Sequence, residues 1–248
     1  LITGGDSGIG RAVAVAYAKE GAKVFITHKE ECEDARQTMF DIDRLGGEAD
    51  SLDGDIRDPD FVQELVDAVI ERFGRLDILV NNAGVTWGAD AMDFPMDRFR
   101  WVFEVNVTGL FHLCMLSARS MKEIGAGKIV NISSIAGLGG SFPEEQDTIA
   151  YNASKAAVIN LTKDLAVKWG AYNICVNAIL PGPFPTHMTK RHWENLGGEE
   201  SFYESTPLRK VGGPDDMKGA VVFLCSRASD HITGVSIPID GGIHAHIG

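Results

Sequence analysis

Cysteine is scarce in this sequence. The chain has only Cys32, Cys114, Cys175 and Cys225, and no two of them stand in a CxxC spacing. Scattered cysteines of this kind are typical of buried free thiols in a reducing compartment. We therefore expect a cytoplasmic protein without a disulfide framework.

Long apolar runs and an excess of positive charge are also missing. Apolar runs such as Leu76–Val80 and Val221–Cys225 are far shorter than the ~20 residues that a membrane helix needs, and no signal peptide is visible. Lysine and arginine number 23 against 35 aspartates and glutamates, which leaves a net charge of −12. Such a chain repels a phosphate backbone unless it carries a strong local basic patch. We therefore expect no membrane partner and no nucleic-acid partner.

The chain contains a regular alternation of short β-rich apolar runs and longer amphipathic segments. Strands that are buried on both faces and separated by helices form parallel sheets with right-handed crossovers. The pattern therefore predicts one doubly wound Rossmann-type α/β domain over residues 1–248, with a parallel sheet flanked by helices on both faces. The predicted strands are Lys23–Thr27, Leu76–Val80, Lys128–Ser133, Ile174–Leu180 and Ser236–Ile239, and the predicted helices are Arg11–Glu20, Pro59–Phe73, Asp97–Ile124, Tyr151–Trp169 and Pro214–Ser226.

Two local signals refine this picture. Pro59 and Pro214 each stand just inside a predicted helix start, a position that proline favours. Only Gly182–Val211 is long and irregular. Because loops of that size in compact domains usually act as lids or binding segments, we expect a substrate lid at about residues 183–208.

A glycine-rich loop lies between the first strand remnant and the first helix. Glycines are needed where the backbone turns sharply and lets a pyrophosphate approach, and the helix N-terminus then offers free N–H groups to the anion. The spacing is GxxxGxG rather than the commoner GxGxxG, and a purely structural turn would also need glycine. The candidate dinucleotide-binding residues of this loop are Gly4, Asp6, Ser7, Gly8, Ile9 and Gly10.

The end of the second strand bears on the choice between NADP and NAD. An acidic residue there would bind a free adenosine ribose and repel a 2′-phosphate, but none is present among Thr27, His28 and Lys29. Lys29 could instead pair with a phosphate, so we expect NADP to be preferred, with NAD as the alternative. The carboxylates that follow, Glu30, Glu31, Glu33 and Asp34, are interpreted as first-turn residues that complement a helix dipole.

Small and amide residues follow two further strands. Asn82, Ala83 and Gly84 close the strand that ends at Val80, where they could border a cofactor or shape a turn. Asp55 and Ile56 follow Leu52-Asp53-Gly54 at another strand end. Contact with the adenine and a turn-forming role are equally good interpretations of Asp55.

The segment YNASK at 151–155 opens a strong helical pattern. Tyr151 and Lys155 are four residues apart and share one helix face, so the ammonium group can lie near the phenol and lower its pKa. Tyr151 could then exchange a proton with a carbonyl or alcohol oxygen. A bare YxxxK is more often a surface pair, but Ser134 ends the preceding apolar strand, where it could hold the substrate oxygen. Asn106 lies inside an apolar helical pattern, where asparagine is mildly unfavourable, and it could bond to the backbone or to a water.

Taken together, these motifs resemble the short-chain dehydrogenases/reductases, most closely the gluconate 5-dehydrogenase-like and 3-oxoacyl-carrier-protein reductase-like members. The resemblance runs from Thr3 to Asp240-Gly241-Gly242. It rests on TGGDSGIG at 3–10, NNAG at 81–84, Asn106, ISS at 132–134, YNASK at 151–155, and Pro181-Gly182 with Thr186.

The resemblance implies an NAD(P)-dependent oxidoreductase that interconverts a carbonyl and a secondary alcohol, with Ser134, Tyr151, Lys155 and Asn106 as its catalytic tetrad. In the family, Lys155 also bonds the nicotinamide ribose, and Asn106 holds a water in the proton relay. Pro181, Gly182 and Thr186 match the segment around the nicotinamide. The resemblance also implies a homo-tetramer or homo-dimer, formed partly through the helices that carry Asn106 and Tyr151.

Substrate selection should fall to residues 183–208 and Ala136–Ile149. The interval between Ser134 and Tyr151 is 17 positions, longer than in many relatives, with the extra residues at 141–147. A sugar acid or polyol and a 3-oxoacyl thioester are the two substrate classes we expect. No metal is expected, because the histidines near the C-terminus, His244 and His246, lack a partner carboxylate in sequence. The alternative function is a non-catalytic dinucleotide-binding regulator or scaffold.

Overall fold

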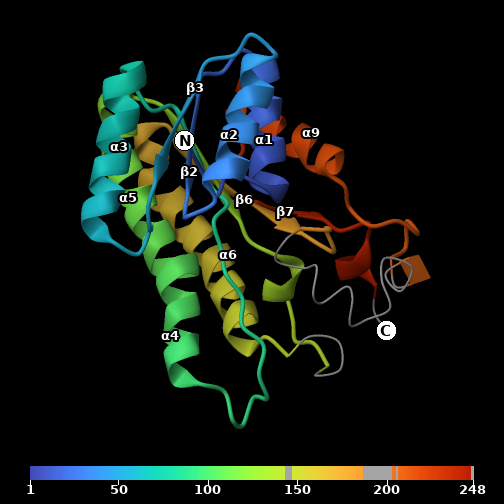
Figure 1. Ribbon diagram of the computed structural model, residues 1–248. Coiled ribbons are helices and arrows are strands. Elements are labelled where there is room, and N and C mark those ends of the chain that lie inside the picture. The colour runs from blue at the N-terminus through green and yellow to red at the C-terminus, as the bar shows by residue number, and fades with distance from the viewer. Residues whose placement is uncertain (143–146, 187–202, 205, 247–248) are drawn as a thin grey trace.

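The computed structural model describes residues 1–142, 147–186, 203–204 and 206–246. Within these residues the chain forms a seven-stranded parallel sheet in the order β3-β2-β1-β4-β5-β6-β7 (Figure 1). Helices cover both faces, which confirms the predicted doubly wound Rossmann-type fold. The strands are β1 (Ile2–Thr3), β2 (Val24–His28), β3 (Ala49–Asp53), β4 (Ile78–Asn81), β5 (Gly127–Ile132), β6 (Ile174–Pro181) and β7 (Ser236–Ile239).

Two layers of helices enclose the sheet. The first layer holds α1, α2 and α9, and the second holds α3, α4, α5 and α6, on opposite sides of the strands in Figure 1. Their bounds are α1 (Gly8–Lys19), α2 (Cys32–Asp43), α3 (Pro59–Phe73), α4 (Met96–Phe103), α5 (Leu110–Ile124), α6 (Ile149–Trp169) and α9 (Pro214–Cys225).

Successive residues of the central strands face opposite layers. Leu79 and Ile129 belong to the core that α3, α5 and α6 pack, whereas Val80 and Val130 belong to the core that α1 and α9 pack. Because side chains alternate between the faces of a strand, a strand buried on both faces is apolar at nearly every position. Burying each such side chain contributes roughly 1.5–3 kcal/mol.

Most predicted element boundaries lie within three residues of the observed ones. The proline signals hold at both sites: Asp58 caps α3 by accepting a hydrogen bond from the backbone N–H of Asp60, 3.0 Å away, and Pro59 follows it. At α9, the backbone N–H of Gly213 donates to a carboxylate oxygen of Asp216 at 2.8 Å.

The single helix predicted over Asp97–Ile124 is wrong in one respect. The run is helical throughout, but α4 and α5 are separated by a π-helical segment, η1 (Glu104–Gly109), which contains Asn106. By length and composition the whole run Met96–Ile124 could cross a membrane, yet 56% of its most apolar stretch is buried inside the fold, as in a core helix. Gly109 lies so close to the backbone oxygen of Ile56 that an added Cβ would be 2.6 Å from it.

The order of the strands reverses beside β1. The chain crosses from β1 to β2 and β3 on one side, and then continues from β4 to β7 on the other. In open α/β sheets, ligands bind in the crevice that this reversal leaves at the carboxyl ends of the strands. The glycine loop after β1 and the NNAG segment after β4 both lie at this crevice.

A chain of buried side chains joins β4, β5 and α6. Asn81 Nδ2 donates to Asn131 Oδ1 at 2.9 Å, and Asn131 Nδ2 donates to Thr162 Oγ1 at 3.0 Å. All three residues are at most 2% exposed. Since α6 carries Tyr151 and Lys155, this chain fixes the helix against the strands from which the crevice is built.

Replacing Asn131 with alanine should destabilise the fold. Asn81 and Thr162 would each lose a buried partner, and an unpaired buried polar group costs about 1–3 kcal/mol. Urea denaturation should show this loss, whereas Gln63→Ala on the exposed face of α3 should change the free energy of unfolding little. An unchanged unfolding midpoint for Asn131→Ala would contradict this role.

Candidate active site

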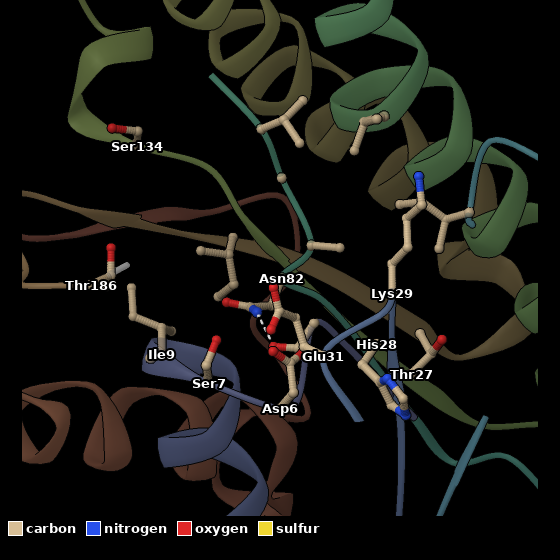
Figure 2. Close-up of a pocket in the computed structure, with 18 of the residues that line it drawn as sticks. Asp6, Ser7, Ile9, Thr27, His28, Lys29, Glu31, Asn82, Ser134 and Thr186 are labelled. Atoms are coloured by element: carbon tan, nitrogen blue, oxygen red, sulfur yellow. Dashed lines mark hydrogen bonds between the residues drawn. The ribbon is translucent and has the colours of Figure 1, made fainter. Parts of the chain in front are cut away.

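A cavity of about 470 Å³ occupies the crevice. Figure 2 shows Thr27, His28 and Lys29 on one side of it and Ser134 and Thr186 on the other, with the glycine loop between them. Gly10 and Asn106 are the two predicted site residues that do not line it. The predicted residues that do are Gly4, Asp6, Ser7, Gly8, Ile9, His28, Lys29, Asp55, Ile56, Asn82, Ala83, Gly84, Ser134, Tyr151, Lys155, Pro181, Gly182 and Thr186.

The glycine loop has a backbone that only glycine supports without strain at two positions. Gly4 and Gly8 have φ angles of +60° and +51°. At Gly10, an added Cβ would lie 1.9 Å from the backbone oxygen of Gly4, so the loop could not close on the start of α1. Ser7 caps α1 without a side-chain hydrogen bond to the helix. The loop therefore holds the positive N-terminus of α1 at the cavity wall, as an anion site requires.

The NNAG segment supports this loop from the neighbouring strand. Asn82 Nδ2 donates to the backbone oxygens of Thr3 and Gly4 at 3.0 and 2.8 Å. The backbone N–H groups of Asn82 and Ala83 in turn donate to Thr3 Oγ1, both at 3.0 Å. Asn82 thus shapes the loop with its side chain and is itself part of the cavity wall.

Two cations and one carboxylate meet beside the end of β2. Lys29 Nζ lies 3.0 Å from Asp55, and the Arg57 guanidinium binds both carboxylate oxygens of the same residue. The hydrogen bond from Arg57, with a further one from Lys29, holds the pKa of Asp55 far below its usual range. Asp55 also accepts from the backbone N–H of Arg57, so the turn-forming interpretation of Asp55 holds alongside its place on the cavity wall.

Sequence reasoning missed part of this corner. Glu33 and Asp34 do lie in the first turn of α2, as expected, but Glu31 is the residue before the helix and lines the cavity. Arg57 lines it too. The sequence contained a signal for Arg57, because an Asp two residues before it favours an Asx-type turn. Such a turn directs the Arg57 side chain back toward the end of the strand.

Tyr151, Lys155 and Ser134 come together at the other end of the cavity. Lys155 Nζ lies 5.4 Å from the centre of the Tyr151 ring, and it donates to the backbone oxygen of Ile132 at 2.9 Å. Ser134 hydrogen-bonds Tyr151, which favours the phenolate form. Ser133 Oγ instead donates to the backbone oxygen of Lys155 at 2.8 Å, so of the two serines Ser134 is the one that meets the phenol.

The expected lowering of the Tyr151 pKa is not observed in the structure. Burial raises the pKa of the Tyr151 phenol, and the Ser134 hydrogen bond offsets only part of that effect. Lys155 is 4% exposed, and burial lowers the pKa of its ammonium group to about 8. The lysine is therefore a weaker source of positive charge near neutrality than its sequence spacing suggests, because desolvation acts on both groups.

Asn106 bonds to the backbone, one of the two roles expected for it. Its Oδ1 accepts from the backbone N–H of Val85 at 2.8 Å, and its Nδ2 donates to the Val85 oxygen at 2.9 Å and to Ser154 Oγ at 3.0 Å. A Cβ added to Gly84 would lie 3.4 Å from both Asn106 Oδ1 and Lys155 Nζ. Asn106 thus contacts Gly84, which lines the cavity, but does not line the cavity itself.

The segments expected to select the substrate are described only in part. Pro181, Gly182, Phe184 and Thr186 line the cavity after β6. Of the lid expected at 183–208, residues 187–202 and 205 lie outside the described residues, as do residues 143–146 of the extra loop. Val85, Trp101 and Val105 add an apolar wall that sequence reasoning did not single out.

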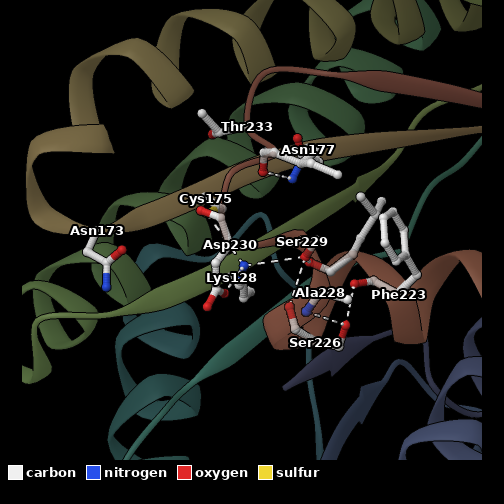
Figure 3. A network of polar contacts seen from close by, with 12 residues as sticks. Lys128, Asn173, Cys175, Asn177, Phe223, Ser226, Ala228, Ser229, Asp230 and Thr233 are labelled. Carbon is white, nitrogen blue, oxygen red and sulfur yellow. Dashed lines mark hydrogen bonds and ion pairs between the residues drawn. The ribbon is translucent and has the colours of Figure 1, made fainter.

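A second polar cluster lies at the amino end of β5, away from this crevice (Figure 3). Lys128 Nζ forms an ion pair with Asp230 at 2.9 Å and hydrogen-bonds Ser229 Oγ at 3.4 Å. Ser229 in turn donates to the backbone oxygen of Leu224, at the end of α9. These contacts tie α9 and the segment after it to the sheet.

Known proteins resemble this chain along most of its length. The family model described as enoyl-(acyl carrier protein) reductase matches residues 4–244. An L-rhamnose 1-dehydrogenase (NAD(P)(+)) of Azotobacter vinelandii is 35% identical over 100% of this chain and 96% of its own, and a 3-oxoacyl-[acyl-carrier-protein] reductase of Thermotoga maritima is 37% identical over 98% and 96%. Among solved structures, a gluconate 5-dehydrogenase of Burkholderia cenocepacia in complex with NADP and tartrate superposes with a TM-score of 0.91, at 32% identity over 99% of this chain and 94% of that one.

The buried ammonium of Lys155 should make stability depend on pH. Its pKa falls from 10.5 in the unfolded chain to about 8 in the fold, so between these values the unfolded chain binds the proton more tightly. Lowering the pH through this window should therefore destabilise the protein relative to Lys155→Met, by up to roughly 3 kcal/mol at about 1.4 kcal/mol per pKa unit. Urea denaturation of both proteins at several pH values measures the difference.

The matched control is Lys163→Met, which removes an exposed lysine from the same helix. The difference in the free energy of unfolding between this variant and the parent should be the same at every pH in this range. If the difference between Lys155→Met and the parent were also independent of pH, the desolvation of Lys155 would be contradicted.

Proposed function

This chain belongs to the short-chain dehydrogenase/reductase family of oxidoreductases, and we propose that it interconverts a secondary alcohol and a carbonyl with Tyr151 as the general acid and base. The observation that carries the proposal is the meeting of Tyr151, Ser134 and Lys155 in one cavity with the glycine loop. The relatives named above are dehydrogenases and reductases, and they give no support to a non-catalytic scaffold.

The chemistry of the residues follows from their protonation. Burial keeps the Tyr151 phenol protonated near neutrality, which is the form that donates a proton to a carbonyl oxygen during reduction. Ser134 binds the same oxygen and orients it toward the phenol. In the direction of oxidation, Tyr151 must accept the alcohol proton, and both the Ser134 hydrogen bond and the charged form of Lys155 favour the phenolate. A bound nicotinamide supplies or accepts the hydride.

Asn106 acts as a positioning residue in this proposal. It bonds Ser154, and Ser154 Oγ donates to the backbone oxygen of Tyr151 at 2.7 Å. The π-helical segment therefore holds the first turns of α6, and with them the phenol. The same position leaves Asn106 Oδ1 next to Gly84 and Lys155, where a water could continue a proton path.

We propose NADP as the preferred cofactor and NAD as the alternative. The N-terminus of α1 would hold the pyrophosphate, and Lys29 with Arg57 would hold the 2′-phosphate in place of Asp55. The relative from Azotobacter vinelandii is named for NAD(P)(+), and the structure from Burkholderia cenocepacia holds NADP. The nicotinamide end would lie against Pro181, Gly182 and Thr186.

A sugar acid, sugar or polyol is the substrate class we propose, because both the rhamnose and gluconate dehydrogenases above act on polyhydroxylated molecules. The 37% identical reductase from Thermotoga maritima makes a 3-oxoacyl thioester the second class. The enzyme would consist of a single domain. A cytoplasmic homo-tetramer or homo-dimer fits the exposed apolar Phe111 and Val167 on α5 and α6; a monomeric mass by light scattering would contradict it.

Replacing Tyr151 with phenylalanine should abolish turnover while keeping cofactor binding. The variant keeps the ring but lacks the proton-transferring oxygen, so kcat should fall by the ~10²–10⁴ typical of an acid–base group. Absorbance of NADPH and NADH, followed across sugar acids, sugars, polyols and 3-oxoacyl thioesters, identifies a substrate first and then measures the loss. If the variant turned over that substrate at the parent rate, Tyr151 would not be the proton donor.

Replacing Lys29 with alanine should weaken NADPH binding selectively. The lost charge-assisted hydrogen bond is worth roughly tenfold or more in the dissociation constant of NADPH, and the constant for NADH should change little. Fluorescence titration with both nucleotides measures the two constants. Equal changes in both constants would remove the basis for preferring NADP.

A further inference from the structure

A buried imidazole nitrogen lies next to the cavity without a hydrogen-bond partner. His28 is 7% exposed, and its Nδ1 is buried and makes no hydrogen bond among the described residues. The nearest carboxylate oxygen is Asp53 Oδ1 at 3.6 Å, which is too far for a hydrogen bond. A buried polar atom of this kind requires an explanation.

The fold brings two further ligand groups to this nitrogen. Strand pairing places His28 directly opposite Asp53 at the ends of β2 and β3. Glu30 turns the chain back with φ +67°, and its backbone N–H donates to Asp53 Oδ1 at 2.9 Å. Cys32, the first residue of α2, then lies close enough that one ligand atom from each of His28, Cys32 and Asp53 falls within 4.8 Å of the others.

These separations suit three ligands around one ion. Zinc bonds of about 2.0–2.3 Å to nitrogen, oxygen and sulfur in a tetrahedron put neighbouring ligand atoms roughly 3.3–3.8 Å apart. The distance between His28 Nδ1 and Asp53 Oδ1 already has this value, and the exposed Cys32 has its ligand atom within 4.8 Å of both other groups. A thiolate with an imidazole selects zinc over magnesium or calcium, which prefer oxygen alone.

We propose that His28, Cys32 and Asp53 form a binding site for a divalent zinc-class cation, with its fourth position open to solvent. The site adjoins Lys29, the residue that follows His28 at the end of β2 (Figure 2). With the thiol neutral, the three side chains carry a charge of about −1, and with Zn²⁺ and a thiolate they carry about 0. The ion therefore makes the adenosine end of the cavity more positive by one unit.

This gain of charge has a consequence that rests on the proposed function. A more positive surface beside Lys29 favours the 2′-phosphate of NADPH over the free ribose of NADH. Zn²⁺ should thus tighten NADPH relative to NADH by roughly two- to tenfold, since a single charge acts across partly screened solvent.

Calorimetric titration of the nucleotide-free protein with ZnCl₂ tests the site directly. The parent should bind one equivalent that the Cys32→Ser and Asp53→Asn variants bind at least roughly tenfold more weakly. Cys225→Ser, which alters a thiol away from the trio, is the matched control and should bind like the parent. Co²⁺ should give a thiolate-to-cobalt absorption band in the parent and in Cys225→Ser, and none in Cys32→Ser.

The outcomes separate the parts of the proposal. Equal Zn²⁺ binding by the parent and by Cys32→Ser, or no binding by either, would overturn the metal site without touching the oxidoreductase assignment, because neither nucleotide nor substrate is present. Zn²⁺ binding that leaves the ratio of NADPH to NADH dissociation constants unchanged would overturn the coupling to the cofactor alone. A ratio that shifts in the parent but not in Cys32→Ser supports both.

Discussion

The hydrogen bond from Lys155 Nζ to the backbone oxygen of Ile132 is the contact on which the site depends. It fixes α6 to the carboxyl end of β5, and Ser133 Oγ returns a second bond from the strand end to the backbone of Lys155. An ammonium group taken out of water needs such a partner, because its desolvation is costly. The position of Lys155 in turn sets the position of the Tyr151 ring one helical turn away. It also places the ring beside the Ser134 hydroxyl at the end of β5. Gly137 allows this close approach, since an added Cβ would lie 2.7 Å from the backbone of Lys155 and Ala156.

Burial and charge oppose each other at both ends of the cavity, with different outcomes. At Tyr151 and Lys155, desolvation dominates. It raises the pKa of the Tyr151 phenol and lowers the pKa of the Lys155 ammonium group, so the neutral form of each side chain is favoured. At Asp55, two cations dominate, and the carboxylate stays ionised. The first end is thus arranged for moving a proton, and the second for holding fixed charge. The Asp55 carboxylate keeps Lys29 and Arg57 oriented. An anionic ligand group at this end would take the place of Asp55 as their partner.

The β2–β3 edge shows how one short connection serves several roles. β3 is an edge strand with only two apolar residues, Ala49 and Leu52, both partly buried, so it contributes little to the core. Its register nevertheless determines which carboxylate faces His28 and where the chain turns toward Asp55. Lys29, Glu31 and Arg57 line the cavity from this edge, and the trio of His28, Cys32 and Asp53 stands directly beside it. Changes of sequence here would alter cofactor recognition without disturbing the central strands.

The sequence by itself determined the fold class, most element boundaries and the identity of more than half of the cavity residues. Largely apolar runs such as those of β5 and β6 are local properties, as are helix-start signals such as Asp58-Pro59. Family motifs likewise occupy fixed positions along the chain. Only the tertiary structure decided three further points. It interrupted the long helix at Asn106, because side-chain bonds to Val85 and Ser154 outweigh regular helical geometry there. It brought Glu31 and Arg57 to the cavity and Asp53 to His28, because strand register is a long-range property. It also reversed the expected shift of the Tyr151 pKa, because burial depends on everything packed around a group and not on its neighbours in sequence.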